Sequence, residues 1–152
     1  PDVRRAGTPD GMLSVSLEVA KSENMPEAWI HAAAVLDYYA HPEGGKRASG
    51  EESWELTLSP GPKHIAKLSP LVGKSTRIGF KLEVGVSESV LVERAMEQIA
   101  AYGVDAVVAN LMGEVTDENT PRCRIVKPDG SVHPMKDNLE LCEAIEAIIS
   151  SN

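Results

Sequence analysis

The sequence predicts an α/β fold built on a mainly parallel β-sheet. Apolar segments of strand length alternate with segments of helical periodicity along most of the chain. Strands that alternate with helices form parallel sheets through right-handed crossovers. Two of the apolar segments are continuous rather than alternating, which is typical of strands covered on both faces. Because 152 residues suffice for one hydrophobic core, we predict a single domain that spans residues 1–152.

Composition and charge exclude several kinds of partner. The chain is 42% hydrophobic and 25% charged, which indicates a folded globular protein rather than a disordered one. Its formal net charge of −8 argues against general binding to nucleic acid or to an anionic membrane, because both need a basic surface. No apolar run approaches the roughly 18 residues of a membrane span, and no signal peptide is visible. We therefore expect a cytoplasmic protein without a nucleic-acid or membrane partner.

The first predicted elements are a helix and a buried strand. Thr8 is a typical N-cap before Pro9, and an apolar stripe continues to about Lys21. The strand spans residues 29–36 and ends at Asp37, where polar sequence begins. Its three consecutive alanines leave the backbone accessible, and ligands of parallel sheets bind outside the carboxyl ends of the strands. A closely packed strand that ends in an ordinary surface Asp explains these residues equally well.

A long irregular segment follows the strand. Residues 38–53 have no periodicity, and loops of this length are usually functional or disordered. The segment carries Gly44-Gly45-Lys46-Arg47, two flexible residues followed by two cations, although it lacks the spacing of a Walker loop. A flexible solvated loop is the alternative to a phosphate-binding one. Alternating residues then predict a short strand from Trp54 to Leu58.

The second half of the chain repeats the alternation of helices and strands. Ser87 and Gly103 delimit its clearest helix as N-cap and C-terminal stop, and Asn138 is expected to cap the last helix. The polar residues of the clearest helix are expected to face water, and they are Glu88, Glu93, Arg94, Glu97 and Gln98. The predicted elements are a short helix within 63–71, a strand at 77–83, the helix at 87–102, a strand at 105–110, a hairpin of 123–127 with 131–135, and a helix from 138 to about 148. We therefore expect a three-layer, Rossmann-like sheet with a C-terminal β-hairpin, in which the strand ends near Asp37, Glu83 and Asn110 meet at one edge.

Other residues receive structural interpretations. Cys123 and Cys142 form no motif and are expected to be buried reduced thiols. His31 is expected to be a satisfied core or interface histidine, and the histidines show no metal-ligand spacing. The chain begins at Pro1 without an initiator Met, and its first residues resemble the end of a strand. We expect it to be a fragment, a processed piece or part of something longer.

Four segments in register resemble the phosphopantothenoylcysteine synthetase family. Residues 32–38, Ala-Ala-Ala-Val-Leu-Asp-Tyr, resemble its Ala-Ala-Ala-Val-Ala-Asp-Trp/Tyr segment. The basic residues 45–47, the Leu-Thr-Leu and Gly-Pro-Lys-His-Ile segments within 56–65, and Gly-Phe-Lys-Leu-Glu at 79–83 with Val-Ala-Asn at 108–110 resemble further family segments. His64 departs from the family, which has Asp at this place. The resemblance covers about residues 2–149.

The resemblance implies a ligase that joins 4′-phosphopantothenate to cysteine in coenzyme A biosynthesis. A nucleoside triphosphate, CTP or ATP, would activate the carboxylate as an acyl-nucleotidylate with Mg²⁺ present, and a homodimer and a preceding N-terminal segment are expected. The implied catalytic cations are Lys46 and Arg47, and the implied substrate-side residues are Lys81, Glu83 and Asn110. Asp37 is the implied contact to Mg²⁺ through the nucleotide. The implied nucleotide-binding residues are Ala32, Ala33, Ala34, Asp37, Pro62, Lys63, His64, Ile65 and Phe80.

Two alternatives stay open from the sequence. The first is a non-catalytic nucleotide-binding or assembly module of the same fold. The second is a flavin- or dinucleotide-binding oxidoreductase, which the absence of a GxGxxG turn disfavours. A Gly-rich turn encoded upstream of Pro1 would favour the ligase, and a coloured preparation would favour the oxidoreductase.

Overall fold

A computed structural model describes residues 2–40, 44–45, 50, 53, 55–114, 117 and 119–151. Lys46, Arg47 and Trp54, which the sequence analysis singled out, therefore lie outside the described residues. The elements in chain order are α1 (Pro9–Ala20), β1 (Ala28–His31), β2 (Tyr38–Ala40), β3 (Leu58–Pro60), α2 (His64–Leu68), β4 (Thr76–Glu83), α3 (Glu88–Tyr102), β5 (Ala106–Leu111), the 3₁₀ turn η1 (Met112–Glu114), β6 (Cys123–Val126), β7 (Val132–Met135) and α4 (Asn138–Ser150).

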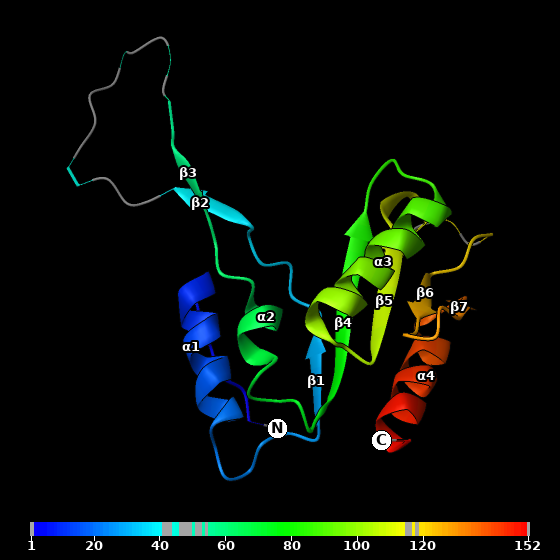
Figure 1. The fold of residues 1–152 in the computed structure, drawn as a ribbon. Helices are drawn as coiled ribbons and strands as arrows, with labels where there is room; N and C mark the ends of the chain where they lie inside the picture. The colour runs from blue at the N-terminus through cyan, green and yellow to red at the C-terminus, as the bar shows by residue number, and fades with distance from the viewer. Residues whose placement is uncertain are drawn as a thin grey trace.

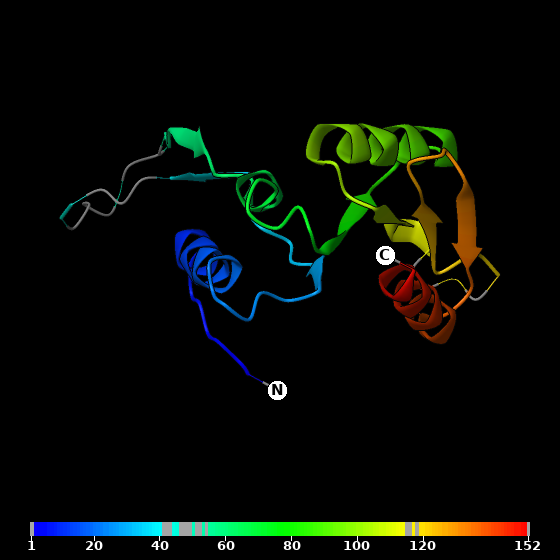
Figure 2. The same ribbon diagram turned by 60° about the horizontal axis from the view of Figure 1, so that its bottom comes forward.

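The described strands form a five-stranded sheet in the order β1-β4-β5-β6-β7, and a separate two-stranded ribbon of β2 and β3. β1, β4 and β5 are parallel, whereas β6 and β7 form the antiparallel C-terminal hairpin. Helix α3 covers one face of the sheet and α4 covers the other, as Figures 1 and 2 show together. The predicted three-layer α/β fold with a C-terminal hairpin is confirmed.

Alternating residues of the central strands supply a core on each face of the sheet. Val107 and Ala109 pack with Leu91 and Ala95 of α3 on one face. On the other face, the alternate strand residues pack with Ile148 of α4. These strand residues are Ile78, Ala106, Val108, Cys123 and Ile125. A third cluster joins α1 and α2 over Trp29 through Ala20, Leu68 and Val72. The side-chain period of two in a strand explains why one sheet serves two cores.

Local capping signals are reproduced with one exception. The Thr8 hydroxyl accepts the Gly11 N–H at 3.1 Å, and the Ser87 hydroxyl accepts the Val90 N–H at 3.4 Å. Gly103 ends α3 in the left-handed conformation, with φ of 62°. The prediction that Asn138 caps the last helix is wrong, because the Asp137 carboxylate accepts the N–H groups of residues 139 and 140, both at 2.9 Å.

The first strand is shorter and less covered than predicted. β1 ends at His31, where its pairing with β4 stops opposite Gly79, and residues 32–36 leave the sheet. Ile30 is 49% exposed because β1 is the edge strand of the described sheet and α4 lies over the other end. The prediction of a strand to Leu36 buried on both faces is therefore wrong. Residues 2–6, which resemble the end of a strand, form no regular structure.

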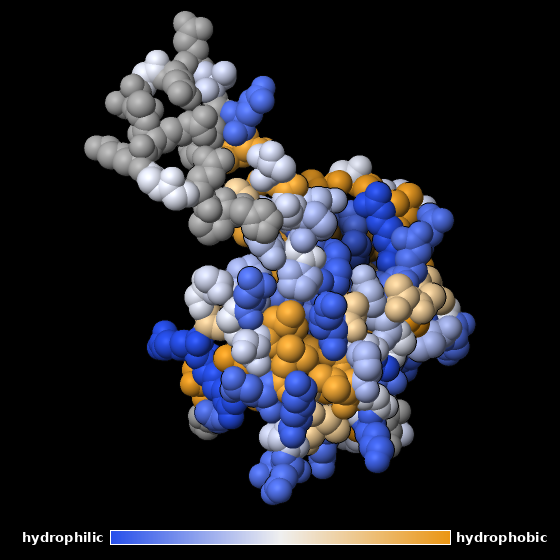
Figure 3. Space-filling view, turned by 60° about the vertical axis from the view of Figure 1, so that its left-hand side comes forward, coloured by the Kyte–Doolittle hydropathy of each residue, from blue (hydrophilic) through white to orange (hydrophobic). Residues whose placement is uncertain are grey.

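The segment predicted as an irregular loop begins instead with a strand. β2 pairs antiparallel with β3, and Tyr38 lies opposite Pro60. The Gly61 N–H donates to the Asp37 carbonyl at 2.7 Å, and a Cβ on Gly61 would lie 2.8 Å from the Tyr39 ring. The strand predicted at 54–58 begins only at its last residue. Figure 1 shows the resulting ribbon projecting from the body of the molecule, and Figure 3 shows hydrophobic residues exposed on the neighbouring surface.

The two cysteines differ in their surroundings. Cys123 is buried in the core beneath α4, as predicted, and burial raises the pKa of its thiol. Cys142 is exposed on α4, so the prediction that it is buried is wrong. A helix presents successive residues to different faces, and Leu141 rather than Cys142 packs against the core cluster on this side.

Candidate functional site

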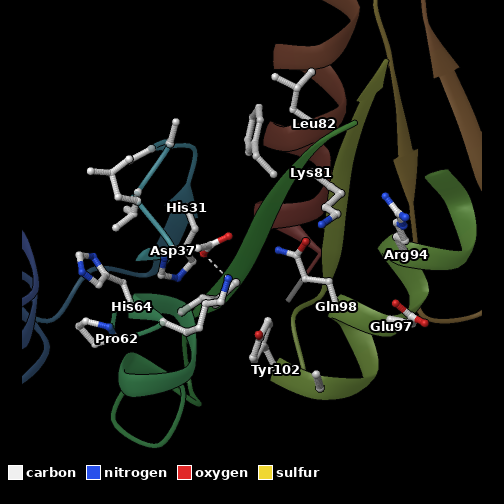
Figure 4. A pocket seen from close by; sticks show the side chains of 18 of the residues that line it. His31, Asp37, Pro62, His64, Lys81, Leu82, Arg94, Glu97, Gln98 and Tyr102 are labelled. Carbon is white, nitrogen blue, oxygen red and sulfur yellow. Dashed lines mark hydrogen bonds and ion pairs between the residues drawn. The ribbon is translucent and has the colours of Figure 1, made fainter. Parts of the chain in front are cut away.

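A cleft of about 580 Å³ opens at the carboxyl ends of β1 and β4. The loop after β1 and the turn before α2 form one wall, and α3 forms the opposite wall (Figure 4). The cleft exists because β1 stops opposite Gly79 whereas β4 continues to Glu83. The edge of β4 beyond Gly79 is therefore not covered by β1, and Phe80, Lys81 and Leu82 line the cleft.

The cleft brings together most of the residues that the sequence singled out. The residues of the predicted nucleotide set that line it are Ala33, Ala34, Asp37, Pro62, Lys63, His64, Ile65 and Phe80. Lys81 lines it as well, whereas Ala32, Glu83 and Asn110 are absent from the lining. Asn110 pairs with Leu82 in the sheet register, one strand farther from the β1 edge. The parallel pairing of β1 and β4 thus brings residues that are far apart in the sequence to the same cleft.

Asp37 and Lys63 form an ion pair across the first wall (Figure 4). The Lys63 ammonium donates to Oδ1 of Asp37, and this hydrogen bond raises the pKa of Lys63. The two side chains are 61% and 55% exposed, respectively, so the pair contributes little to stability. It does fix a cation and a carboxylate where the loop after β1 meets the start of α2.

The α3 wall was missed from the sequence. Arg94, Glu97 and Gln98 were interpreted as facing water, yet they line the cleft together with Ala101 and Tyr102. Their spacing of three and four residues forms a stripe beside the buried one, which is the signal that could have found them. The Gln98 amide lies over β4 at Gly79, where a Cβ would collide with its Nε2. Gly79 therefore permits this close approach of α3 to β4.

Arg77 holds the end of this wall in place. Its guanidinium donates to the Tyr102 carbonyl at 2.9 Å and to the Gly103 carbonyl, which are acceptors left open at the end of α3. It also donates to the Ser69 hydroxyl at 2.6 Å. The cation thus joins β4, α2 and the C-terminus of α3, where positive charge complements the helix dipole.

Glu83 does not line the cleft, but it binds two cations that do. Its Oε1 is 3.1 Å from the Lys81 ammonium, and its Oε2 pairs with the Arg94 guanidinium. Partial burial alone would raise the pKa of Glu83, but the hydrogen bonds and charges of Lys81 and Arg94 outweigh that effect and lower the pKa. The carboxylate therefore stays charged and keeps both cations near the rim.

Two histidines lie at the side of the cleft formed by β1 and α2 (Figure 4). Within the described part of the chain, Nε2 of His31 and both ring nitrogens of His64 are buried without a hydrogen-bond partner. The prediction that His31 is a satisfied histidine is therefore wrong for this nitrogen. Burial lowers the pKa of both imidazoles, and the positive charge of Arg77 lowers the pKa of His31 further. Both side chains are thus held in the neutral form.

The cleft provides cations for an anionic ligand but no metal centre of its own. Lys63, Lys81 and Arg94 contribute positive charge to it in a chain of net charge −8. No group of three or more His, Cys, Asp and Glu side chains that could hold a metal occurs among the residues described. Asp37 is already paired with Lys63, and the other lining carboxylate, Glu97, lies on the opposite wall, so the residues present do not form a Mg²⁺ site by themselves. No described helix is long and apolar enough to span a membrane.

The fold is shared with solved structures of pantothenate metabolism proteins. The DNA/pantothenate metabolism flavoprotein from Streptococcus pneumoniae superposes with a TM-score of 0.76 at 22% identity, covering 96% of this chain and 72% of that one. The C-terminal domain of the coenzyme A biosynthesis bifunctional protein CoaBC gives 0.67 at 17% identity, covering 98% and 66%. A Cab2 H337A mutant in complex with phosphopantothenate-cysteine gives 0.57 at 20% identity, covering 79% and 42%.

Two relatives identified by sequence comparison are both the coenzyme A biosynthesis bifunctional protein CoaBC. CoaBC of Methanocaldococcus jannaschii is 32% identical over 99 residues, which are 65% of this chain and 24% of that protein. CoaBC of Thermococcus kodakarensis is 30% identical over 116 residues, which are 76% and 29%. The chain thus spans about a quarter of the length of these curated relatives. The DNA/pantothenate metabolism flavoprotein C-terminal domain family matches residues 6–151. The resemblance noted from the sequence is confirmed, and the chain belongs to this family.

Proposed function

We propose that this chain supplies the nucleotide-binding cleft of a ligase that joins 4′-phosphopantothenate to cysteine in coenzyme A biosynthesis. One observation carries the proposal: a single cleft gathers every residue of the expected nucleotide set except Ala32. The relatives named for coenzyme A biosynthesis support the same pathway. The solved complex of the Cab2 H337A mutant with phosphopantothenate-cysteine supports the substrate class.

The charges of the cleft suit the first step of such a reaction. A carboxylate and a triphosphate repel each other, and cations that face both groups reduce the barrier to bringing them together. Lys63, Lys81 and Arg94 come from three different elements and supply these cations. The uncovered edge of β4 at Phe80 and the exposed Ala33 and Ala34 offer backbone donors and acceptors for a base or a ribose. The neutral His31 and His64 add no charge to this wall.

Mg²⁺ and the catalytic cations Lys46 and Arg47 remain part of the proposal. Mg²⁺ usually binds through the substrate phosphates with one or two carboxylates, so the triphosphate itself would provide most of its ligands and Asp37 at most one. The ion would neutralise phosphate charge. Lys46 and Arg47 lie outside the described residues. Their replacement by Ala is expected to lower turnover on the order of 10²-fold, the usual loss when electrostatic stabilisation is removed.

The function is tested on the full-length gene product by pyrophosphate release. We expect release that requires 4′-phosphopantothenate and either CTP or ATP with Mg²⁺, and formation of phosphopantothenoylcysteine when cysteine is added. Binding of nucleotide without pyrophosphate release would instead support a non-catalytic nucleotide-binding module. Absence of both binding and turnover with either nucleotide would overturn the proposal.

We also propose that the protein is a homodimer that covers the β2–β3 ribbon. Leu36, Tyr38 and Leu58 in and beside this ribbon are 64%, 60% and 55% exposed. An isolated two-stranded ribbon is marginally stable in water, and contact with a second copy would bury these side chains. Analytical ultracentrifugation of the wild type and of a Leu58→Ser variant tests this. We expect a dimer whose dissociation constant rises in L58S, and a monomeric wild type would contradict it.

A further inference from the structure

Glu83 occupies an unusual place beside the cleft, because it binds two lining residues without lining the cleft itself. Its side chain is 12% exposed, whereas those of Lys81 and Arg94 are 35% and 43% exposed. Each carboxylate oxygen serves a different cation: Oε1 lies 3.1 Å from the Lys81 ammonium, and Oε2 pairs with the Arg94 guanidinium. A single partly buried carboxylate thus holds one cation from β4 and one from α3.

Contacts with β5 already hold β4 and α3 together. At Glu83 itself, β4 pairs with Leu111 of β5. Helix α3 is anchored by its buried Leu91 and Ala95. Ion pairs with partly exposed cations contribute little to stability. The bridge at Glu83 is therefore not needed to join β4 to α3, and its consequence is the orientation of the two cations.

Orientation matters because lysine and arginine have long side chains with many rotamers. A ligand that binds free side chains loses affinity through ordering them, and a site that is ordered in advance avoids this cost. Lys81, Arg94 and Glu83 together carry a net charge of +1, since two cations face one carboxylate. Glu83 thus reduces the net positive charge that an anion meets, but it fixes the positions of the two cations.

We propose that Glu83 is a positioning residue, which holds the Lys81 ammonium and the Arg94 guanidinium at the cleft as a preformed site for phosphate oxygens of the nucleotide. The inference rests on the proposed function, since it assumes that a nucleoside triphosphate occupies the cleft. The proposal predicts a direction of change in nucleotide affinity that is opposite to the one expected from charge balance alone. Loss of a carboxylate beside two cations should strengthen anion binding if Glu83 only balances charge, and should weaken it if Glu83 positions them.

The test is isothermal titration of CTP and ATP, each with Mg²⁺, into the full-length gene product and three variants. Glu83→Gln keeps the size of the side chain but loses its charge, and its NH₂ group cannot accept from a cation. Glu83→Asp keeps the charge with a shorter reach. Glu93→Gln is the matched control, because Glu93 is an exposed residue of α3 that does not line the cleft.

We expect E83Q to weaken nucleotide binding about tenfold, the effect of leaving rotamer-rich side chains unordered, and E83D to give an intermediate affinity. E93Q should stay within about twofold, as is usual for an exposed charge. In the pyrophosphate assay, the KM for nucleotide should rise in E83Q with little change in kcat, since the cations are placed before the reaction. A role confined to stability would change neither constant at temperatures where the variant is folded.

Unchanged or tighter binding by E83Q would overturn the positioning role and leave the proposed function intact. Absence of nucleotide binding by the wild type would overturn the proposed function, and the positioning role with it. If E83Q does not fold, E83D decides: weaker binding at unchanged thermal stability supports the proposal, and wild-type affinity overturns it.

Discussion

Replacement of Arg124 by Met tests how the sheet is held together near the end of β5. The Arg124 side chain is 4% exposed and lies on β6 opposite Ala109. Its guanidinium binds both carboxylate oxygens of Glu114 in η1 and Oε2 of Glu88, the latter at 2.9 Å. These hydrogen bonds raise the pKa of Arg124. The residue therefore joins β6 to the first turn of α3 and to the segment that follows β5.

The magnitude follows from the exposure of each partner. Removal of one member of a buried ion pair costs about 3–5 kcal/mol because the remaining charge is left without compensation. The side chain of Glu114 is 20% exposed, so partial hydration places Arg124→Met near the lower limit, at about 3 kcal/mol. For a chain of this size the melting temperature should fall by about 6–12 °C. Glu88→Gln is the comparison, with a cost of about 0–1 kcal/mol, because Glu88 is 57% exposed.

Urea unfolding followed by circular dichroism measures both variants against the wild type. The expected order is a large loss for R124M and a small one for E88Q, with similar dependence on urea concentration. A loss below about 1 kcal/mol in R124M would refute the reasoning about the buried pair. An equal loss of unfolding free energy in the two variants would refute the argument that the exposure of each side chain sets the size of the loss.

Three further predictions concern stability. The pKa values of His31 and His64 are lowered on folding from 6.5, so the unfolded state binds more protons as the pH falls. Stability should be constant above about pH 6.5 and decline below it, and a double His→Gln variant should flatten this decline in pH-dependent melting curves. Gly103→Ala should cost about 1 kcal/mol in urea unfolding because φ is 62° there; a neutral result would contradict the left-handed cap. Asp137→Ala should cost about 0.5–2 kcal/mol and Asn138→Ala markedly less, and the reverse order would restore Asn138 as the cap.

Local signals in the sequence predicted most of the fold correctly. The caps at Thr8, Ser87 and Gly103 depend on hydrogen bonds and backbone angles within a few residues, so they can be recognised without tertiary contacts. The hairpin of β6 and β7 is also local, since its strands are joined by a short turn that contains Gly130 in the left-handed conformation.

Features set by distant pairing were predicted less well. β1 ends at His31, where its pairing with β4 stops opposite Gly79, and nothing within residues 29–36 encodes that end. The pairing of Tyr38 with Pro60 joins residues on either side of a long segment, and each strand has only three residues, which is too few to define a period in the sequence. Propensity and periodicity describe single segments, whereas these boundaries depend on tertiary contacts.

The candidate site shows the same division. The resemblance selected residues on the β1 and α2 side, and all but Ala32 of the expected nucleotide set line one cleft. The opposite wall, with Arg94 and Gln98, was assigned to solvent because polar residues on an amphipathic helix usually face water. A cleft lined by a polar face of α3 cannot be distinguished from a solvated surface until β4 and α3 are placed together.

The most direct test of the central claim is an NMR titration of the full-length gene product with CTP and with ATP, each with Mg²⁺. If the cleft at the carboxyl ends of β1 and β4 binds the nucleotide, the amide resonances of Ala33, Lys63, Phe80 and Gln98 should shift together. Those around the second cavity, of about 270 Å³ between the hairpin and α4, should stay in place. Shifts centred on His133 and Ala147 of that second cavity, or no shifts with either nucleotide, would contradict the claim.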